Sequence, residues 1–136
     1  MKTTVALIEK GEDGTYGIYT PDLQSVIVGE GETVEEAKDD FENSVIEVHK
    51  AFAEKRKALP KELQGLKFVY KFDVASLFNY IDCINVSKFA QMAGISPSLM
   101  RQYKSGNTYI SEKQAAKIES SLHDLGKKLM QVSLCK

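Results

Sequence analysis

Apolar and polar positions alternate in the first part of the chain, which is the pattern of β-strands. Three short runs rich in β-branched and aliphatic residues, at residues 3–9, 15–20 and 25–29, are separated by polar or glycine-bearing turns. Such runs with short links predict three consecutive strands in an antiparallel meander. A fourth run, residues 66–72, places a large apolar side chain at every second position, so it predicts a half-buried strand beside the first three.

The stretch between the third and fourth predicted strands has the periodicity of a helix. Thr33 followed by Glu36 forms a capping box, and the helix is expected to run to about Ala58, before Pro60. Its apolar stripe consists of Val34, Ala37, Phe41, Val45, Val48 and Phe52. With this helix on one face of the sheet, residues 1–72 are expected to form a small β-β-β-α-β domain of the α+β class, whose uncovered face or edge is left for a partner.

After the fourth strand the periodicity is helical, so residues 73–136 are expected to form a separate all-α domain. An amphipathic pattern predicts its first helix over residues 73–84. The capping box of Ser111 and Gln114 predicts a last helix that ends near Val132.

Between these helices, residues 86–106 carry the pattern of a helix-turn-helix. Gly94 suits a tight turn with a positive φ, and Ser96 and Pro97 suit the N-cap and first position of the following helix. Ser98, Arg101 and Gln102 then face outward, where Arg could read guanine and Gln could read adenine in a DNA major groove. The same pattern also fits an ordinary pair of packed helices.

The last predicted helix has more apolar positions than its own domain requires. Ala115, Ile118 and Leu122 are expected to close the domain core, whereas Leu125, Leu129 and Val132 lie beyond it. These three predict a dimer seam, as paired DNA half-sites would demand. Gly126 leaves open the alternative that the helix breaks and folds back on its own domain.

Composition and charge narrow the class of protein. The apolar fraction is 43%, no segment approaches a membrane span and no signal peptide is recognised, so we expect a cytoplasmic protein. Residues 1–85 hold ten basic and sixteen acidic residues, a net charge of −6, whereas residues 86–136 hold eight and three, a net charge of +5. A basic C-terminal part suits a phosphate binder and an acidic N-terminal part suits a basic protein partner, although drift produces similar asymmetries.

Candidate chemistry in the N-terminal part is weak, so we expect no catalytic site, metal or cofactor. The Gly29–Gly31 stretch lacks the third glycine of a phosphate loop, and His49 and the two cysteines have no partners at metal-ligand spacing. The acidic residues of the predicted helix fit a solvated face better than a metal site. One functional interpretation remains, a surface for docking a basic protein that consists of Glu35, Glu36, Asp39 and Asp40.

Taken in order, the motifs resemble HicB antitoxins of type II toxin–antitoxin systems, in the version with a C-terminal helix-turn-helix of the Cro/repressor class. The N-terminal resemblance rests on residues 14–17 (GTYG), 21–23 (PDL) and 31–37 (GETVEEA). The C-terminal resemblance rests on residues 92–96 (MAGIS), 99–103 (LMRQY), Gly106 and 111–114 (SEKQ).

This resemblance implies a truncated RNase H-like sheet without nuclease activity, which masks HicA, a small basic RNA-cleaving toxin. It also implies that the second domain binds operator DNA as a homodimer or higher oligomer and represses its own operon. By motif position, the base-contacting residues would be Ser96, Pro97, Ser98, Arg101 and Gln102. The phosphate-contacting residues would be Asn85, Ser87, Lys88, Lys104 and Asn107.

Two alternatives stay open at the level of sequence. A stand-alone transcriptional regulator would use the N-terminal domain to sense a small ligand, and a minimal RNase H-like nuclease would use it to cleave RNA in a hybrid. A neighbouring gene for a short basic protein would favour the antitoxin over the regulator, and Mg²⁺-dependent cleavage by the purified N-terminal half would favour the nuclease.

Overall fold

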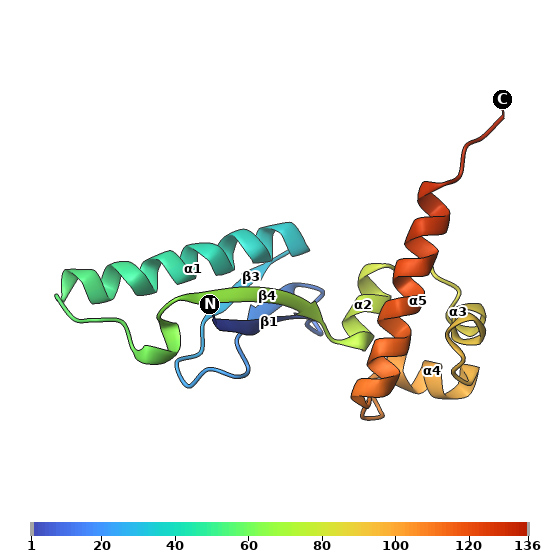
Figure 1. The fold of residues 1–136 in the computed structure, drawn as a ribbon, viewed down its shortest axis with the longest axis horizontal. Helices are drawn as coiled ribbons and strands as arrows, with labels where there is room; N and C mark the ends of the chain where they lie inside the picture. The colour runs from blue at the N-terminus through green and yellow to red at the C-terminus, as the bar shows by residue number, and fades with distance from the viewer. Residues whose placement is uncertain (1, 136) are drawn as a thin grey trace. The chain divides into compact units, whose positions relative to one another are not determined.

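The computed structural model describes residues 2–135, which form an α+β fold with a four-stranded mixed sheet and five α-helices (Figure 1). The strands are β1 (Lys2–Lys10), β2 (Tyr16–Tyr19), β3 (Val28–Gly31) and β4 (Leu66–Phe72). The helices are α1 (Val34–Glu54), α2 (Val74–Tyr80), α3 (Val86–Ala93), α4 (Pro97–Ser105) and α5 (Glu112–Met130), and a short 3₁₀ helix, η1, spans Lys61–Leu63. The chain divides into two compact units between Ser76 and Leu77, a point that lies inside α2.

The sheet of the first unit has the strand order β3-β2-β1-β4. β1 pairs antiparallel with β2, and β2 with β3, which confirms the predicted meander. β4 joins this sheet as predicted, and it lies beside β1 and parallel to it, with Val5 opposite Val69. The long α1 helix provides the crossover that a parallel pair requires and covers one face of the sheet (Figure 1).

The core of the first unit lies between this covered sheet face and α1. Ala6 and Ile8 of β1 and Phe41 of α1 are fully buried. The Phe41 ring meets Phe68 and Tyr70 of β4 edge to face, with ring centroids 5.2 Å and 6.0 Å apart. The alternation in β4 and the three-four spacing in α1 therefore both arise from one shared apolar layer.

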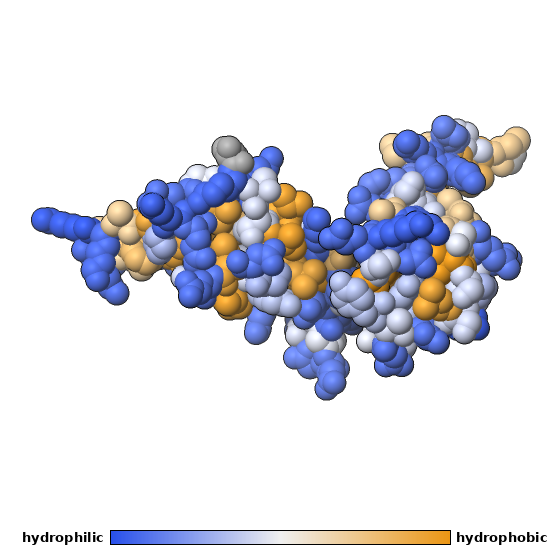
Figure 2. All heavy atoms as spheres, turned by 60° about the horizontal axis from the view of Figure 1, so that its bottom comes forward, coloured by the Kyte–Doolittle hydropathy of each residue, from blue (hydrophilic) through white to orange (hydrophobic). Residues whose placement is uncertain are grey.

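The opposite sheet face is not covered by α1. By the strand alternation it carries Val5 and Leu7, which are half-buried, together with Val28 and Val69, which are exposed. Figure 2 shows apolar side chains gathered over the first unit with hydrophilic ones around them.

The third strand begins later than the pattern predicted, at Val28 rather than near residue 25. The segment before it is held as a loop instead. The buried Thr20 hydroxyl accepts a hydrogen bond from the Ile27 amide at 3.0 Å, and the Glu62 carboxylate accepts from the amides of Gln24 and Ser25, each at 3.0 Å. These bonds satisfy backbone groups that a strand would otherwise have paired.

Three predicted helices also end earlier than expected. α1 ends at Glu54 rather than near Ala58, because Arg56 takes a left-handed φ of 53° and its amide donates to the Ala53 carbonyl. α2 ends at Tyr80 rather than at residue 84, and α5 ends at Met130, so Val132 lies beyond the helix.

The second unit is a set of helices around its own core. Phe78 of α2 meets Phe89 of α3 edge to face at 5.8 Å between ring centroids, and Met100 of α4 and Ile118 of α5 are buried. α3 ends at Gly94, whose φ of 71° is the left-handed conformation predicted for this turn. α3 and α4 are therefore held as two short helices joined by a tight turn.

Candidate nucleic-acid interface

Capping residues fix where α3 and α4 begin. The Asn85 side chain accepts a hydrogen bond from the Lys88 amide at 3.0 Å, so Asn85 is the N-cap of α3 and Ser87 lies in its first turn. The Ser96 hydroxyl accepts from the Leu99 amide at 3.2 Å, and Pro97 is the first residue of α4. Both starts follow from local sequence.

Packing then decides which side of α4 is presented to solvent. Met100 and Tyr103 point into the core of the second unit, with relative exposures of 0% and 5%. Ser98, Arg101 and Gln102 are not part of that core, and all three are exposed. The side chains that could read base edges therefore remain accessible to a ligand.

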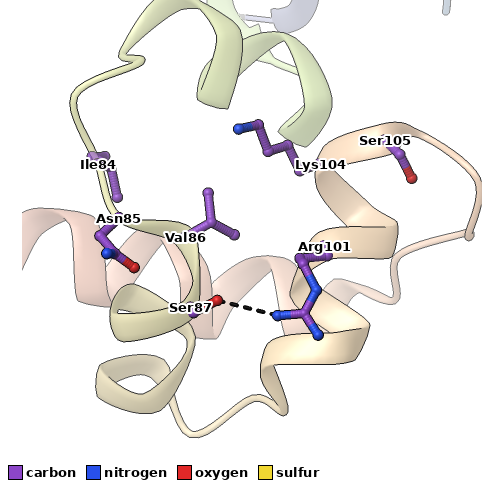
Figure 3. A pocket seen from close by; sticks show the side chains of 7 residues that line it. All are labelled: Ile84, Asn85, Val86, Ser87, Arg101, Lys104 and Ser105. Atoms are coloured by element: carbon purple, nitrogen blue, oxygen red, sulfur yellow. Dashed lines mark hydrogen bonds between the residues drawn. The ribbon is translucent and has the colours of Figure 1, made fainter.

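A shallow depression of about 590 Å³ lies between the start of α3 and the C-terminal half of α4 (Figure 3). It is lined by Ile84, Asn85, Val86, Ser87, Arg101, Lys104 and Ser105. Arg101 extends from α4 towards α3, where its guanidinium donates to the Ser87 hydroxyl at 3.1 Å (Figure 3). This bond ties the second helix to the first turn of α3 and sets the position of the Arg101 charge.

The electrostatics of this depression suit an anion. The amide groups at the start of α3 carry the partial positive charge of a helix N-terminus, and Arg101 and Lys104 add two full charges. No carboxylate is among the residues that line it. A phosphate placed here would meet donors from two helices, including the Ser87 hydroxyl, whereas the Ser105 hydroxyl already donates to the Gln102 carbonyl at 2.9 Å.

Gln102 is oriented from the turn that follows α4. The Thr108 hydroxyl donates to the Gln102 side-chain oxygen at 2.9 Å, which fixes the amide group on the exposed helix face. Asn107, an exposed residue of the same turn, donates its backbone amide to the Gln102 carbonyl at 3.2 Å. Gly106 permits this turn through a φ of 77°.

The structure groups some of the predicted DNA-contacting residues and separates others. Asn85, Ser87 and Lys104, expected at phosphates, line the depression together with Arg101. Lys88 instead lines a groove beside α5. Among the residues expected at bases, the Ser96 hydroxyl is already engaged as a helix cap.

Two features of this interface were not predicted from the sequence. Ser105 lines the depression, and Thr108 orients Gln102. Both lie in a polar stretch of the sequence, residues 105–108 (SGNT), and nothing in that stretch distinguishes these two residues from their neighbours.

The four acidic residues proposed for docking a basic protein are all exposed on the first two turns of α1. Two of them also support the fold. The Glu36 side chain accepts from the amide of Glu32, the residue before the N-cap Thr33, at 3.0 Å, and Asp40 accepts from the Glu30 amide of β3 at 2.8 Å. A substitution at Glu36 or Asp40 would therefore disturb the fold as well as any binding surface.

A further acidic residue of α1 lies close to this group. Glu42 accepts a hydrogen bond from the Tyr70 hydroxyl at 3.2 Å. Burial of the phenol, together with the negative charge of Glu42, raises the pKa of Tyr70 to about 12. Tyr70 is therefore a neutral donor at physiological pH, and Glu42 remains an acceptor on the acidic side of α1.

The residues predicted at a dimer seam differ in their surroundings. Leu125 is half-buried in the second unit, whereas Leu129 and Val132 are 63% and 60% exposed. Val132 follows the end of α5 and does not continue its helical stripe. A dimer seam formed by these residues would therefore consist of the last turns of α5 and the segment that follows the helix.

Comparisons with protein-family models, with curated proteins and with solved structures found no match for this chain. Within residues 2–135, no cluster of three or more His, Cys, Asp or Glu side chains is arranged to hold a metal ion. No helix in that range has both the length and the apolar character needed to cross a membrane.

Proposed function

We propose that this chain is a non-enzymatic antitoxin and autorepressor of the HicB type. In this proposal the second unit is a helix-turn-helix domain that binds operator DNA as a dimer. The first unit, a truncated RNase H-like fold, binds and neutralises a small basic RNA-cleaving toxin of the HicA type in the cytoplasm.

The observation that carries the proposal is the arrangement of α3 and α4. Arg101 and Gln102 are exposed on α4, and the adjacent depression collects Arg101, Lys104 and the start of α3. In a helix-turn-helix the second helix enters the major groove while the first helix meets the backbone, so bases and phosphates would be contacted at neighbouring points. The capped starts and the left-handed Gly94 support the same interpretation.

The charge of each unit supports the division of function. Residues 1–76 hold ten basic and fifteen acidic residues, and residues 77–136 hold eight basic and four acidic ones. The net charges are thus −5 and +4. The second unit would attract DNA, and the first would steer towards a cationic protein that itself binds RNA.

DNA binding is tested with the duplex immediately upstream of the gene that encodes this chain. Arg101→Ala and Gln102→Ala should each weaken specific binding by ~1–3 kcal/mol, because each removes a base-reading side chain. Lys104→Ala should weaken binding to specific and unrelated duplexes alike, and should reduce the slope of log K against log salt by about 1. Fluorescence anisotropy over a salt series measures both effects.

Lys55→Ala provides a matched control, since this exposed lysine lies at the end of α1 in the first unit. It should leave both affinities unchanged. Wild-type affinity in the Arg101 and Gln102 variants would show that α4 does not read the operator. A uniform loss in all variants, Lys55→Ala included, would point to non-specific electrostatic binding instead.

A further inference from the structure

An apolar groove of about 500 Å³ opens in the second unit, between the end of α2, the α3 helix and the second half of α5. This volume lies within the range of sites that hold small molecules. Seven of the eleven residues that line it are Ile, Leu, Met or Phe, so the groove suits an apolar group. Ile81, Met92 and Leu129 on its walls are 37%, 39% and 63% exposed, so a ligand placed here would remove apolar surface from water.

The first turn of α3 gives this groove a polar part. Lys88 is the one charged residue among those that line it, and no carboxylate lines it. Asn85 lines the same part of the groove, and its side-chain oxygen accepts from the Lys88 amide at 3.0 Å. The group that Asn85 can offer to a ligand is therefore its side-chain NH₂. An ammonium group and an amide donor thus stand beside an otherwise apolar surface.

We propose that this groove binds a small anionic amphiphile, a molecule with one carboxylate head and an unbranched apolar tail. The head lies at Lys88 and Asn85, and the tail lies between α3 and α5 over Phe89 and Leu125. Charge complementarity selects a single negative head, because the groove offers a single cation. A polyanion such as the DNA backbone would find no second cation here, whereas an uncharged tail without a head would leave the ammonium group without a partner.

The groove shares a wall with the candidate nucleic-acid interface. Ile84 and Asn85 line both the groove and the depression that contains Arg101 (Figure 3). Lys88 was expected to contact a DNA phosphate, and a carboxylate bound to it would neutralise that charge and repel the DNA backbone. Bound amphiphile should therefore weaken operator binding. This step rests on the proposed function, whereas the ligand site itself does not.

The ligand site is tested without DNA or toxin, by NMR titration of the full chain with three probes. Sodium octanoate has a head and a tail, 1-octanol has the tail alone, and sodium acetate has the head alone. Octanoate, at concentrations where it forms no micelles, should shift the amide signals of Lys88, Phe89 and Gly126 and reach saturation. Acetate should not shift them. Octanoate shifts that do not saturate, or that acetate reproduces, would overturn the proposal.

A first variant tests the head. Lys88→Gln should weaken octanoate binding by ~2–5-fold, the range expected when one exposed ion pair is lost. It should leave octanol binding unchanged. Lys113→Gln is the matched control, since this exposed lysine of α5 lies outside the groove, and it should change neither affinity. An equal loss for octanoate and octanol in the Lys88→Gln chain would overturn the assignment of a charged head.

A second variant tests the tail. A Cβ at Gly126 would meet no atom within 4 Å, so Gly126→Leu can place a side chain in the groove without displacing α5. It should weaken octanoate binding by about tenfold or more, because the leucine takes the place of the tail. Ser120→Leu adds the same side chain at an exposed position of α5 outside the groove and should not. Undiminished octanoate binding in a folded Gly126→Leu chain, as judged by its melting temperature, would overturn the proposal.

The effect on DNA is measured by anisotropy with the operator duplex. Saturating octanoate should weaken operator binding by about fivefold relative to the same concentration of sodium acetate, because one cation beside the backbone is neutralised. The Gly126→Leu chain should not respond. Operator affinity that saturating octanoate leaves unchanged would overturn the coupling.

Two further outcomes keep this proposal apart from the proposed function. A chain that binds octanoate in the groove but binds no operator would contradict the proposed function while supporting the ligand site. Octanoate binding that fades as the chain is concentrated into a dimer would assign the groove to the contact between two copies and overturn the ligand site.

Discussion

At the scale of single residues, the glycines of β3 set how closely α1 lies on the sheet. A Cβ on Gly29 would stand 2.4 Å from the Phe41 nitrogen, and one on Gly31 would stand 2.5 Å from the Ala37 nitrogen. In both cases the obstacle is helix backbone, which cannot rotate away. Gly29 and Gly31 therefore allow α1 to pack closely on β3. This packing explains why the two glycines are present although the stretch does not form a phosphate loop.

Gly29→Ala should therefore destabilise the first unit. We expect a loss of ~1–3 kcal/mol in the free energy of unfolding, because α1 must shift away from β3 to admit the methyl group. Urea denaturation followed by circular dichroism measures it. Gly17→Ala in β2 is the matched control, since a Cβ there meets nothing within 4 Å, and it should change stability by less than about 0.5 kcal/mol.

The Glu62 carboxylate holds the loop before β3 through hydrogen bonds, and the stability that these bonds contribute depends on pH. Hydrogen bonds from the amides of Gln24 and Ser25 lower the pKa of Glu62 below its ordinary value. Because the folded-state pKa is the lower one, this contribution to stability is present at neutral pH and above the unfolded-state pKa. It is lost as the pH falls through the folded-state pKa.

NMR titration can detect this loss directly. The amide shifts of Gln24 and Ser25 should titrate with a midpoint below that of an ordinary glutamate, and Glu62→Gln should abolish this titration. An unchanged titration in the Glu62→Gln chain would assign the pH dependence to another carboxyl group.

At the scale of elements, the residue that caps α4 is also one of the proposed base contacts. Ser96 was expected to approach a base, and in the structure its hydroxyl caps the helix. A substitution that removes the Ser96 hydroxyl therefore lowers helix stability, whatever its effect on DNA binding. A variant that keeps the capping oxygen but adds a charge can distinguish the effect on helix stability from the effect on DNA binding.

Ser96→Asp and Ser96→Ala should have opposite effects on stability. Aspartate keeps the cap and favours the helix N-terminus, so the free energy of unfolding should be equal or higher, whereas alanine should lower it by about 1 kcal/mol. Aspartate should nevertheless weaken operator binding, because it places a negative charge beside DNA phosphates. Denaturation and anisotropy on the same samples measure the two effects, and undiminished binding by Ser96→Asp would place the start of α4 away from the duplex.

At the scale of the whole molecule, α2 contributes to both units. The Ser76 hydroxyl accepts from the Lys10 amide at 2.8 Å, and the Asp73 amide donates to the Ile8 carbonyl, so the first turn completes the sheet domain. Phe78, later in the same helix, packs on Phe89 in the second unit. A cut at residue 73, where the strand pattern ends, would remove Ser76 from the first unit.

The two proposed functions should be separable if α2 is kept intact. A fragment of residues 1–80 should neutralise the protein encoded by the neighbouring gene and should not bind operator DNA. Growth rescue on co-expression and anisotropy measure these activities. A fragment ending at residue 73 should unfold at lower urea concentration, and failure of the 1–80 fragment to neutralise would mean that toxin binding needs the second unit.

Features that depend on neighbouring residues could be predicted from the amino-acid order alone. Strand alternation in β4, the stripe of α1, the caps at Thr33, Ser96 and Ser111, and the left-handed turn at Gly94 were all predicted, and the structure contains them. Each depends on hydrogen bonds or packing within one or two turns, so the local pattern specifies it.

Contacts between residues far apart in the chain became visible only in the folded molecule. Glu62 reaches Gln24 across 38 positions, and Arg101 reaches Ser87 across 14. No local periodicity encodes such contacts, because they form only after packing has brought two elements together. For the same reason the sequence marked Arg101, Gln102 and Ser87 as candidates, while only the fold showed that Ser87 orients Arg101 and that Thr108 orients Gln102.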